Sequence, residues 1–444
     1  MIGGLKPYPE YRESGVPWLG RIPAHWEIRK LRSLVKPRKE RNRTDLPLLS
    51  VVREKGVIRR SMTGDDDNHN FIPDNLSNHK VCRAGDLVIN KMKAWQGSLG
   101  IAPCDGIVSP AYFVFDFGLT NRTFGQTLLR SKPYVGAFAR ASDGVRIGQW
   151  DLAIPRMREI EVLLPSPDEQ SAIVRFLVSA NQRFEAAARA KKELIALLNE
   201  QKQFIIHRAV TRGLDPNVRL KPSGIAWLVN LPQHWEVRRL KWVVRLQRGY
   251  DLPAEKRTHG CIPVVSSGGI IDTHSVSRAT GPGVVMGRYG STDSVFYIES
   301  DFWPHNTALY VTDFQGNDRR WCYYLLRTIS KGDYAGKSAV PGVDRKDLYE
   351  IVVPRPPRVE QREIAGSLDA HLADLERATE RTEREIDLIR EYRTRIIADV
   401  VTGQLDVREV SRTLPAEVDA PELSVEACTE DESEELLEAV ADHE

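Results

Sequence analysis

The sequence predicts an α+β fold that is a tandem duplication, in which a mixed α/β domain followed by a long helix occurs twice. A segment near the start of each half repeats, and so does a long helical stretch near the end of each half. Short β-branched runs between these repeats predict the mixed domains. With 444 residues, the chain has room for two or three domains with separate cores.

The first repeated segment, which we call the frame, occupies residues 15–31 and returns without a gap as residues 224–240. Roughly half of its positions are identical, far above chance for two unrelated segments. The inserts that follow the two frame copies align only in fragments, such as residues 85–90 with 281–286. A repeated frame around two unlike inserts predicts two recognition modules with different targets.

Irregular β structure is predicted in both inserts, because short β-branched runs alternate there with Gly, Pro, Asp and Ser. Short helices are expected at residues 124–130 and 319–328, at similar places in the two copies. The expected strand regions are residues 46–57, 86–90, 107–117, 262–267, 284–286, 295–299, 308–312 and 348–354.

A long helix is predicted over residues 167–211, where apolar or small residues recur every three or four positions. Pro167 opens it and Gly213 ends it, as expected for helix termini. The second copy runs from about residue 359 to 402 with the same apolar pattern. Each is long enough to need a partner, so we expect the two helices to pair as an antiparallel coiled coil. Polar interruptions favour a short bundle that is open to further helices over an uninterrupted zipper.

Charge is distributed unevenly along the chain. Residues 415–444 contain twelve acidic side chains and no Lys or Arg, so the net charge of +2 becomes +14 without them. A body this basic suits a polyanion, since Lys and Arg that neutralise phosphates release condensed counterions. A well-solvated charged surface is the alternative. The acidic tail is expected to be a mobile appendage.

Motifs for metal, cofactor or catalytic chemistry are missing from the sequence. The five cysteines form no Cys-x-x-Cys pair, and residues 331–338 have one residue too few between glycines for a phosphate-binding loop. The acidic run at residues 65–67 beside His69 is more typical of a solvated loop than of a metal site. We therefore expect no cofactor and no metal. Without a signal peptide or an apolar run of membrane length, the chain is expected to be cytoplasmic.

The frame and the helix starts resemble those of a known family. Residues 14–27, their second copy from Ser223, and the Glu-Gln pairs at 169–170 and 360–361 look like the specificity subunit of type I restriction-modification systems. The resemblance spans about residues 8 to 410. It implies two target recognition domains that each read one half of a split double-stranded DNA site, and two helices that form the spacer between them.

The resemblance also implies partners. Two modification subunits, which bind S-adenosylmethionine and methylate adenine, would be held by the helices and frame segments, and motor-nuclease restriction subunits would join that assembly. The specificity subunit itself has no catalytic residues. The expected parts are target recognition domain 1 (1–165), spacer helix 1 (166–213), target recognition domain 2 (214–356), spacer helix 2 (357–407) and the acidic tail (408–444).

Candidate DNA-binding residues are the basic or amide side chains in Gly-rich loops, because Arg and Gln can bond base edges while Lys more often contacts phosphate. For each one, an ordinary surface charge is the alternative. They are Arg59, Arg60, Lys91, Lys93, Arg146 and Gln149 in the first domain, and Arg278, Arg288, Lys337 and Arg345 in the second.

The repeated aromatic residues have a different predicted role. Trp18, Trp26, Trp227 and Trp235 occupy equivalent frame positions, which favours core packing or subunit docking over base stacking. His25 and His234 also repeat, and hydrogen-bonded structural roles are expected for both.

A sequence-specific DNA-binding scaffold of a methylase and endonuclease complex is the function that these observations predict. Two alternatives remain at this point. One is an adaptor whose two modules bind protein, and the other is a self-contained methyltransferase or nuclease.

Overall fold

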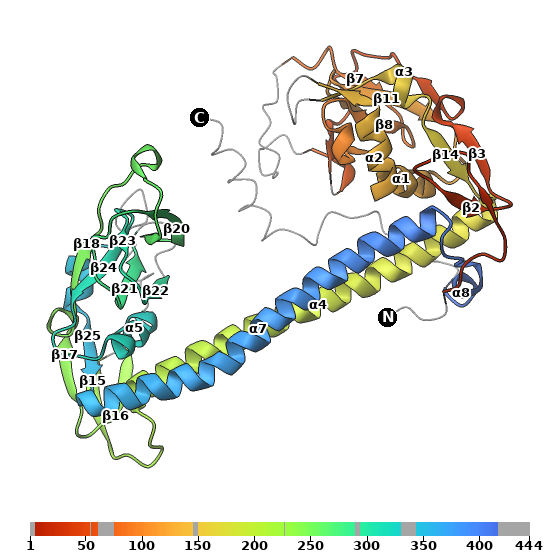
Figure 1. The fold of residues 1–444 in the computed structure, drawn as a ribbon. Coiled ribbons are helices and arrows are strands. Elements are labelled where there is room, and N and C mark those ends of the chain that lie inside the picture. Colours follow the sequence, from red (N-terminus) through yellow and green to blue (C-terminus); the bar gives the residue numbers. More distant parts are fainter. Residues whose placement is uncertain are drawn as a thin grey trace. The chain divides into compact units, whose positions relative to one another are not determined.

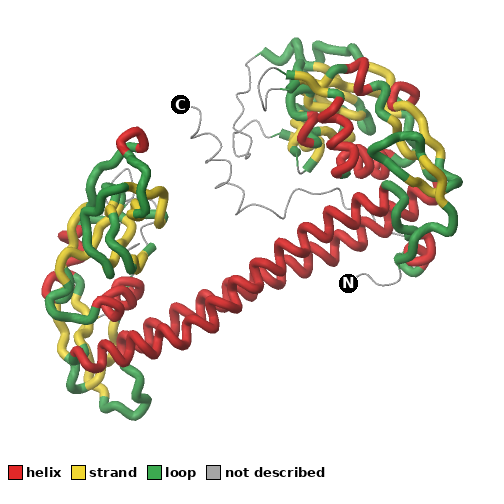
Figure 2. The backbone as a smooth tube through the Cα atoms, viewed as in Figure 1, coloured by secondary structure: helices red, strands yellow, loops and turns green. Residues whose placement is uncertain are grey.

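The computed structural model describes residues 5–53, 55–60, 75–144, 150–225, 227–288, 294–329 and 343–415. The chain forms two compact units. Unit 1 comprises Met1–Arg189 with Ile386–Glu444, and unit 2 comprises Ala190–Glu385. Each unit mixes helices and strands (Figures 1 and 2), which confirms the predicted α+β class. In the described part of the chain, no helix combines the length and apolar character needed to cross a bilayer.

A four-stranded antiparallel sheet forms the centre of unit 1. Its order is β4 (Val35–Pro37), β11 (Tyr112–Phe117), β8 (Leu87–Asn90) and β9 (Leu99–Ile101). Side chains alternate between its faces. Leu87 and Phe115 lie in the core that includes the helices, whereas Val88 and Val114 pack in a second cluster with the hairpin of β5 and β6. The helices are α1 (Arg122–Arg130) and α2 (Lys132–Arg140), and the hairpin strands are β5 (Leu49–Val52) and β6 (Gly56–Arg59).

Unit 2 has a central sheet with the same topology. Its order is β18 (Arg245–Arg248), β24 (Ala308–Asp313), β21 (Gly283–Gly287) and β22 (Val295–Ile298). Val284 and Leu309 face the core that holds α5 (Arg319–Thr328). Val285 and Tyr310 face a second cluster that includes Val265 of β19 (Ile262–Ser266). β19 lies between β20 (Gly269–His274) and β23 (Trp303–Pro304) in a three-stranded sheet.

The two inserts are therefore related in topology although their sequences align only in fragments. If the four strands of each sheet are numbered in chain order, their order across the sheet is first, fourth, second, third in both units. The alignable fragment, residues 85–90 with 281–286, contains β8 in one unit and most of β21 in the other. The predicted short helices are confirmed as α1 and α5, and each begins at a capping side chain. Asn121 accepts a hydrogen bond from the Phe124 N–H, and Asp318 accepts one from the Trp321 N–H.

In each unit the frame joins the two ends of the insert. β3 (Glu27–Lys30) pairs with β14 (Glu161–Leu164), and β17 (Glu236–Arg239) pairs with β25 (Val352–Arg355). One further backbone bond repeats, from Leu31 N–H to Ile160 in unit 1 and from Leu240 N–H to Ile351 in unit 2, both at 2.8 Å.

Frame hairpins precede these pairs in both units, and several short elements complete the fold. The hairpin strands are β1 (Tyr11–Glu13), β2 (Arg21–Pro23), β15 (Leu220–Ile225) and β16 (Leu228–Pro232). The other elements are β7 (Lys80–Cys82), β10 (Gly106–Val108), β12 (Ser142–Asp143), β13 (Asp151–Leu152), α3 (Ile154–Met157), α6 (Arg345–Glu350) and α8 (Arg408–Arg412).

The long helices are α4 (Pro167–Arg212) and α7 (Arg358–Val401), close to the predicted ranges. In unit 1 the beginning of α4 packs with the end of α7, where Ile173 and Phe176 share a core with Ile396. In unit 2 the end of α4 packs with the beginning of α7 through Ile206 and Ile364. Within each unit the helices are thus antiparallel, which confirms the predicted pairing.

Tryptophans of the frame pack against the ends of these helices. Trp26 and Trp235 are each only 1% exposed. In unit 2 the glycine after α4, Gly213, has φ +76°, and a Cβ there would lie 3.2 Å from the Trp235 ring. Gly403 after α7 has φ +77°, and a Cβ there would lie 2.4 Å from Pro23 and 3.1 Å from the Trp26 ring. A left-handed residue without a side chain is needed at both places. Trp18 and Trp227 are half-buried against the same cores, so core packing is confirmed for all four.

Candidate nucleic-acid interface

The repeated histidines bind glutamates at the starts of the long helices. His25 Nε2 lies 2.9 Å from Glu169 Oε2, and His234 Nε2 lies 2.6 Å from Glu360 Oε1. In unit 2 the Trp235 indole N–H also donates to Glu360, at 2.8 Å. These contacts agree with structural roles for both histidines. The glutamate partners were not predicted, although their repetition in the sequence was a signal that could have found them.

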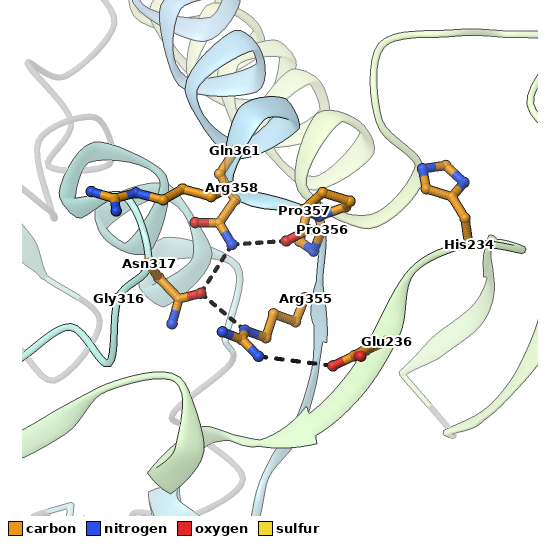
Figure 3. A pocket seen from close by; sticks show the side chains of 9 residues that line it. All are labelled: His234, Glu236, Gly316, Asn317, Arg355, Pro356, Pro357, Arg358 and Gln361. Carbon is orange, nitrogen blue, oxygen red and sulfur yellow. Dashed lines mark hydrogen bonds and ion pairs between the residues drawn. The ribbon is translucent and has the colours of Figure 1, made fainter.

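In unit 2 a surface pocket lies beside the contact between His234 and the start of α7 (Figure 3). It is lined by His234, Glu236, Gly316, Asn317, Arg355, Pro356, Pro357, Arg358 and Gln361. Asn317 Oδ1 accepts hydrogen bonds from Arg355 at 3.1 Å and from Gln361 at 3.0 Å, and Arg355 also pairs with Glu236. These hydrogen bonds and this ion pair link β17 and β25 to the start of α7. The lining of the pocket offers no paired nucleophile and base, so the pocket is not a convincing catalytic site.

Basic residues gather instead at one end of each central sheet, which we call the loop end. In unit 1 this is the end where β8 stops at Asn90 and β11 begins at Tyr112. In unit 2 it is the end where β21 stops at Gly287 and β24 begins at Ala308. The loops at this end carry three of the predicted site residues that the structure describes, Lys91, Lys93 and Arg288.

At the loop end of unit 1, three cations crowd together. Lys80 donates to the Tyr112 carbonyl at 2.5 Å, and Arg41 lies opposite Lys80 in an isolated bridge. Burial lowers the pKa of Lys80, and the charges of Arg41 and Lys91 lower it further. Crowded cations of this kind favour a bound anion, because a nearby negative charge would raise the pKa of Lys80 again.

Lys91 and Lys93 belong to the turn between β8 and β9. The carbonyl of Lys91 accepts a hydrogen bond from the Leu152 N–H at 3.0 Å, and its ammonium pairs with Asp151. Lys93 is exposed. The structure therefore places these two predicted residues at the loop end, where Lys91 lies close to Lys80. Sequence reasoning missed Arg41 and Lys80. No sequence signal links Arg41 to Lys80, because only strand pairing brings them together.

Arg288 occupies the equivalent place in unit 2. It follows β21, and its carbonyl accepts a hydrogen bond from the Val343 N–H at 2.9 Å, as the Lys91 carbonyl does from Leu152 in unit 1. Its own N–H donates to the Thr307 carbonyl at 3.1 Å. The two units thus use one backbone arrangement to fix a basic residue at the loop end.

The other two described candidates of unit 2 contact different parts of the domain. The exposed Arg278 guanidinium covers the Tyr250 ring at 5.6 Å and the Trp303 ring at 5.2 Å. Arg345 begins α6 and reaches the Leu246 carbonyl at 3.4 Å. Stacking on two rings orients the Arg278 guanidinium group. An oriented guanidinium suits bidentate hydrogen bonding to a base edge.

The remaining predicted residues are not part of this arrangement. Arg59 and Arg60 lie at the end of β6, on a different sheet from Lys91. Arg146, Gln149 and Lys337 lie outside the described residues. So do the acidic run beside His69 and the glycine-rich stretch at 331–338. Among the residues with a described placement, no three His, Cys, Asp or Glu side chains are grouped as metal ligands.

Comparisons with known proteins match part of the sequence and most of the fold. Residues 232–385 match the family described as the type I restriction modification DNA specificity domain. A solved chain from work on complex assembly and conformational transition of the type I R-M system has a similar fold, with a TM-score of 0.63 and 16% identity. The match covers 86% of this chain and 98% of that one.

Two further solved structures resemble the chain less closely. The HsdS subunit from Thermoanaerobacter tengcongensis has a TM-score of 0.47 and 18% identity, over 88% of this chain and 99% of that one. The type I restriction-modification S subunit from M. genitalium has a TM-score of 0.37 and 14% identity, over 85% and 96%. No curated protein matches the chain.

Proposed function

We propose that the chain is the specificity subunit of a type I restriction-modification system, since residues 232–385 match the type I restriction modification DNA specificity domain. It reads double-stranded DNA and contributes no catalytic residue. In this proposal residues 1–165 and 214–356 are the two target recognition domains. Residues 166–213 and 357–407 are the spacer helices. The predicted tail, residues 408–444, begins with α8, whose Val410 packs against the core of unit 1, and most of its acidic side chains follow from residue 415 onward.

The observation that carries the proposal is the basic loop end shared by the two units. Arg41, Lys80 and Lys91 in unit 1 and Arg288 in unit 2 occupy the same end of equivalent sheets. Cations there can neutralise phosphates, while the loops around them differ and can read different bases. Each unit would read one half of a split target, and because the loops differ, the target would be asymmetric.

A protein-binding adaptor is the main alternative, and the crowded cations at the loop end favour DNA over it. A specific test is single-molecule sequencing of genomic DNA from cells that express this chain with a modification subunit, compared with cells that lack the chain. We expect new methyladenine confined to one split motif. Unchanged methylation in the presence of an assembled complex would contradict the proposal and favour the adaptor.

Exchange of one insert should alter half of the target. When residues 32–164 are replaced by the first insert of another specificity subunit, we expect the methylated motif to change in one half-site and to keep the other. The reason is that each insert has its own cores and sheet. The motif is read by the same sequencing, and loss of both half-site preferences would contradict independent modules.

The proposed modification and restriction subunits need a docking surface, and α4 offers one in unit 2. Leu194, Leu197 and Phe204 are 43%, 62% and 64% exposed, and their spacing places them along one helical stripe. An exposed apolar stripe on a paired helix is suited to a further helix. We propose that a modification subunit covers it, with two such subunits in the complex.

Introducing charge into this stripe should weaken assembly. For the double variant L197D/F204D we expect roughly tenfold weaker association with the modification subunit, because two apolar contacts are lost. Titration of the full chain with that subunit, followed by analytical ultracentrifugation, measures the change. The control is I271D, which alters an exposed apolar residue of β20. Equal weakening by the control would argue against docking on α4.

A further inference from the structure

The turn that joins β8 to β9 presents an apolar side chain among cations. Met92 lies between Lys91 and Lys93 and is 56% exposed, whereas Met157 and Met286 are almost completely buried. Leaving most of an apolar side chain in water forgoes the free energy of its burial. An exposed methionine at this position therefore points to a binding role if the surrounding structure holds its backbone at the surface.

Both backbone groups of Met92 are held by hydrogen bonds. Its N–H donates to Asn90 Oδ1 at 3.1 Å, and its carbonyl accepts the indole N–H of Trp95 at 3.0 Å. Asn90 is 9% exposed, and the Trp95 ring packs on Trp150 with centroids 5.1 Å apart. The turn is closed by Gly97, whose φ of +88° ends a short 3-10 helix. The backbone of Met92 is thus held by its neighbours at a position where the side chain is exposed.

The charges around Met92 identify the kind of partner. Lys91 and Lys93 flank it in the sequence, and Lys91 is close to Lys80, which is bridged to Arg41. Asp151 is the acidic group that pairs with Lys91. An apolar group within a cationic surface is complementary to the DNA major groove, where phosphates line the edges and the thymine C5-methyl group is apolar.

We propose that Met92 contacts a thymine methyl group in the major groove of the half-site read by unit 1. This inference rests on the proposed function, since it requires that unit 1 binds DNA. It assigns to this domain a base-reading contact made by an apolar residue. Lys93 would contact an adjacent phosphate.

Methionine oxidation tests the contact directly in the assembled complex. Met92 should be oxidised by dilute peroxide at least fivefold more slowly when DNA carrying the methylated motif is bound, as measured by peptide mass spectrometry. Met157 and Met286 serve as internal references because both are buried. Unchanged oxidation of Met92 on DNA that the complex does methylate would overturn the inference and leave the proposed function intact. Protection by the modification subunit without DNA would also overturn it.

Thymine substitution identifies the group that is contacted. Replacing one thymine of the half-site by deoxyuridine removes a single methyl group, and at one position we expect about fourfold weaker binding, the effect of losing one buried methyl contact. The same replacement should have no effect on the variant M92A, and M92L should behave like the native chain. A half-site in which no thymine shows this pattern overturns the assignment to a methyl group. A complex that neither binds nor methylates DNA would instead contradict the proposed function.

Discussion

Replacing Trp235 by Ala is expected to lower the free energy of unfolding of unit 2 by about 3–5 kcal/mol. The Trp235 side chain is 1% exposed and lies in a core cluster with Leu231, Ile206 and Ile364. Its removal leaves a cavity at the joint between the frame and α4, and it takes the indole donor from Glu360. Urea denaturation of the full chain, with hydrogen exchange to locate the change, measures the effect.

The control for this prediction is a tryptophan seven residues further along the chain. Trp242 is 54% exposed, and its ring faces the Arg245 guanidinium at 5.5 Å. For W242A we expect a loss below about 1 kcal/mol, since little burial is removed. Hydrogen exchange should become faster in unit 2 with W235A and remain unchanged in unit 1. Equal effects of W235A and W242A would show that the frame tryptophan does not hold the core.

The frame and the long helices could be predicted from the sequence because both rest on local patterns. The repeat places Trp26 with Trp235 and Glu169 with Glu360 without knowledge of their contacts, and helical spacing reveals α4 and α7. The topology of the inserts could not be predicted in this way. β4 pairs with β11 across more than 70 intervening residues, and strands of three to six residues carry too little pattern to specify such partners.

The candidate interface was predicted in part for the same reason. Lys91 and Arg288 were predicted as basic side chains in Gly-rich loops, and their shared backbone arrangement became visible only in the structure. Met92 was not selected, because an apolar residue next to a strand is usually read as core. Its exposure depends on Asn90 and Trp95, whose hydrogen bonds to it a sequence does not show.

Replacing Arg278 by Ala is expected to weaken binding to the intact target about 30-fold and to relax specificity at one position of the second half-site. A bidentate arginine contact to guanine contributes roughly 1–3 kcal/mol of discrimination. The backbone N–H of Arg278 donates to the Phe302 carbonyl at 3.0 Å, and two aromatic rings support its guanidinium. Because these rings orient the Arg278 guanidinium before binding, little conformational entropy is lost when it binds a base.

A lysine variant at this position distinguishes recognition of a base from the effect of the positive charge alone. R278K keeps the charge but has a single ammonium, so we expect it to restore non-specific affinity and not the preference for one base. The control is R377A, which removes an exposed arginine that pairs with Asp374 on α7. Competition binding with targets altered one base pair at a time, repeated at two salt concentrations, distinguishes the roles. If R278A weakens binding to all sequences equally and lowers the salt dependence by about one phosphate contact, Arg278 binds the backbone and another residue reads that base.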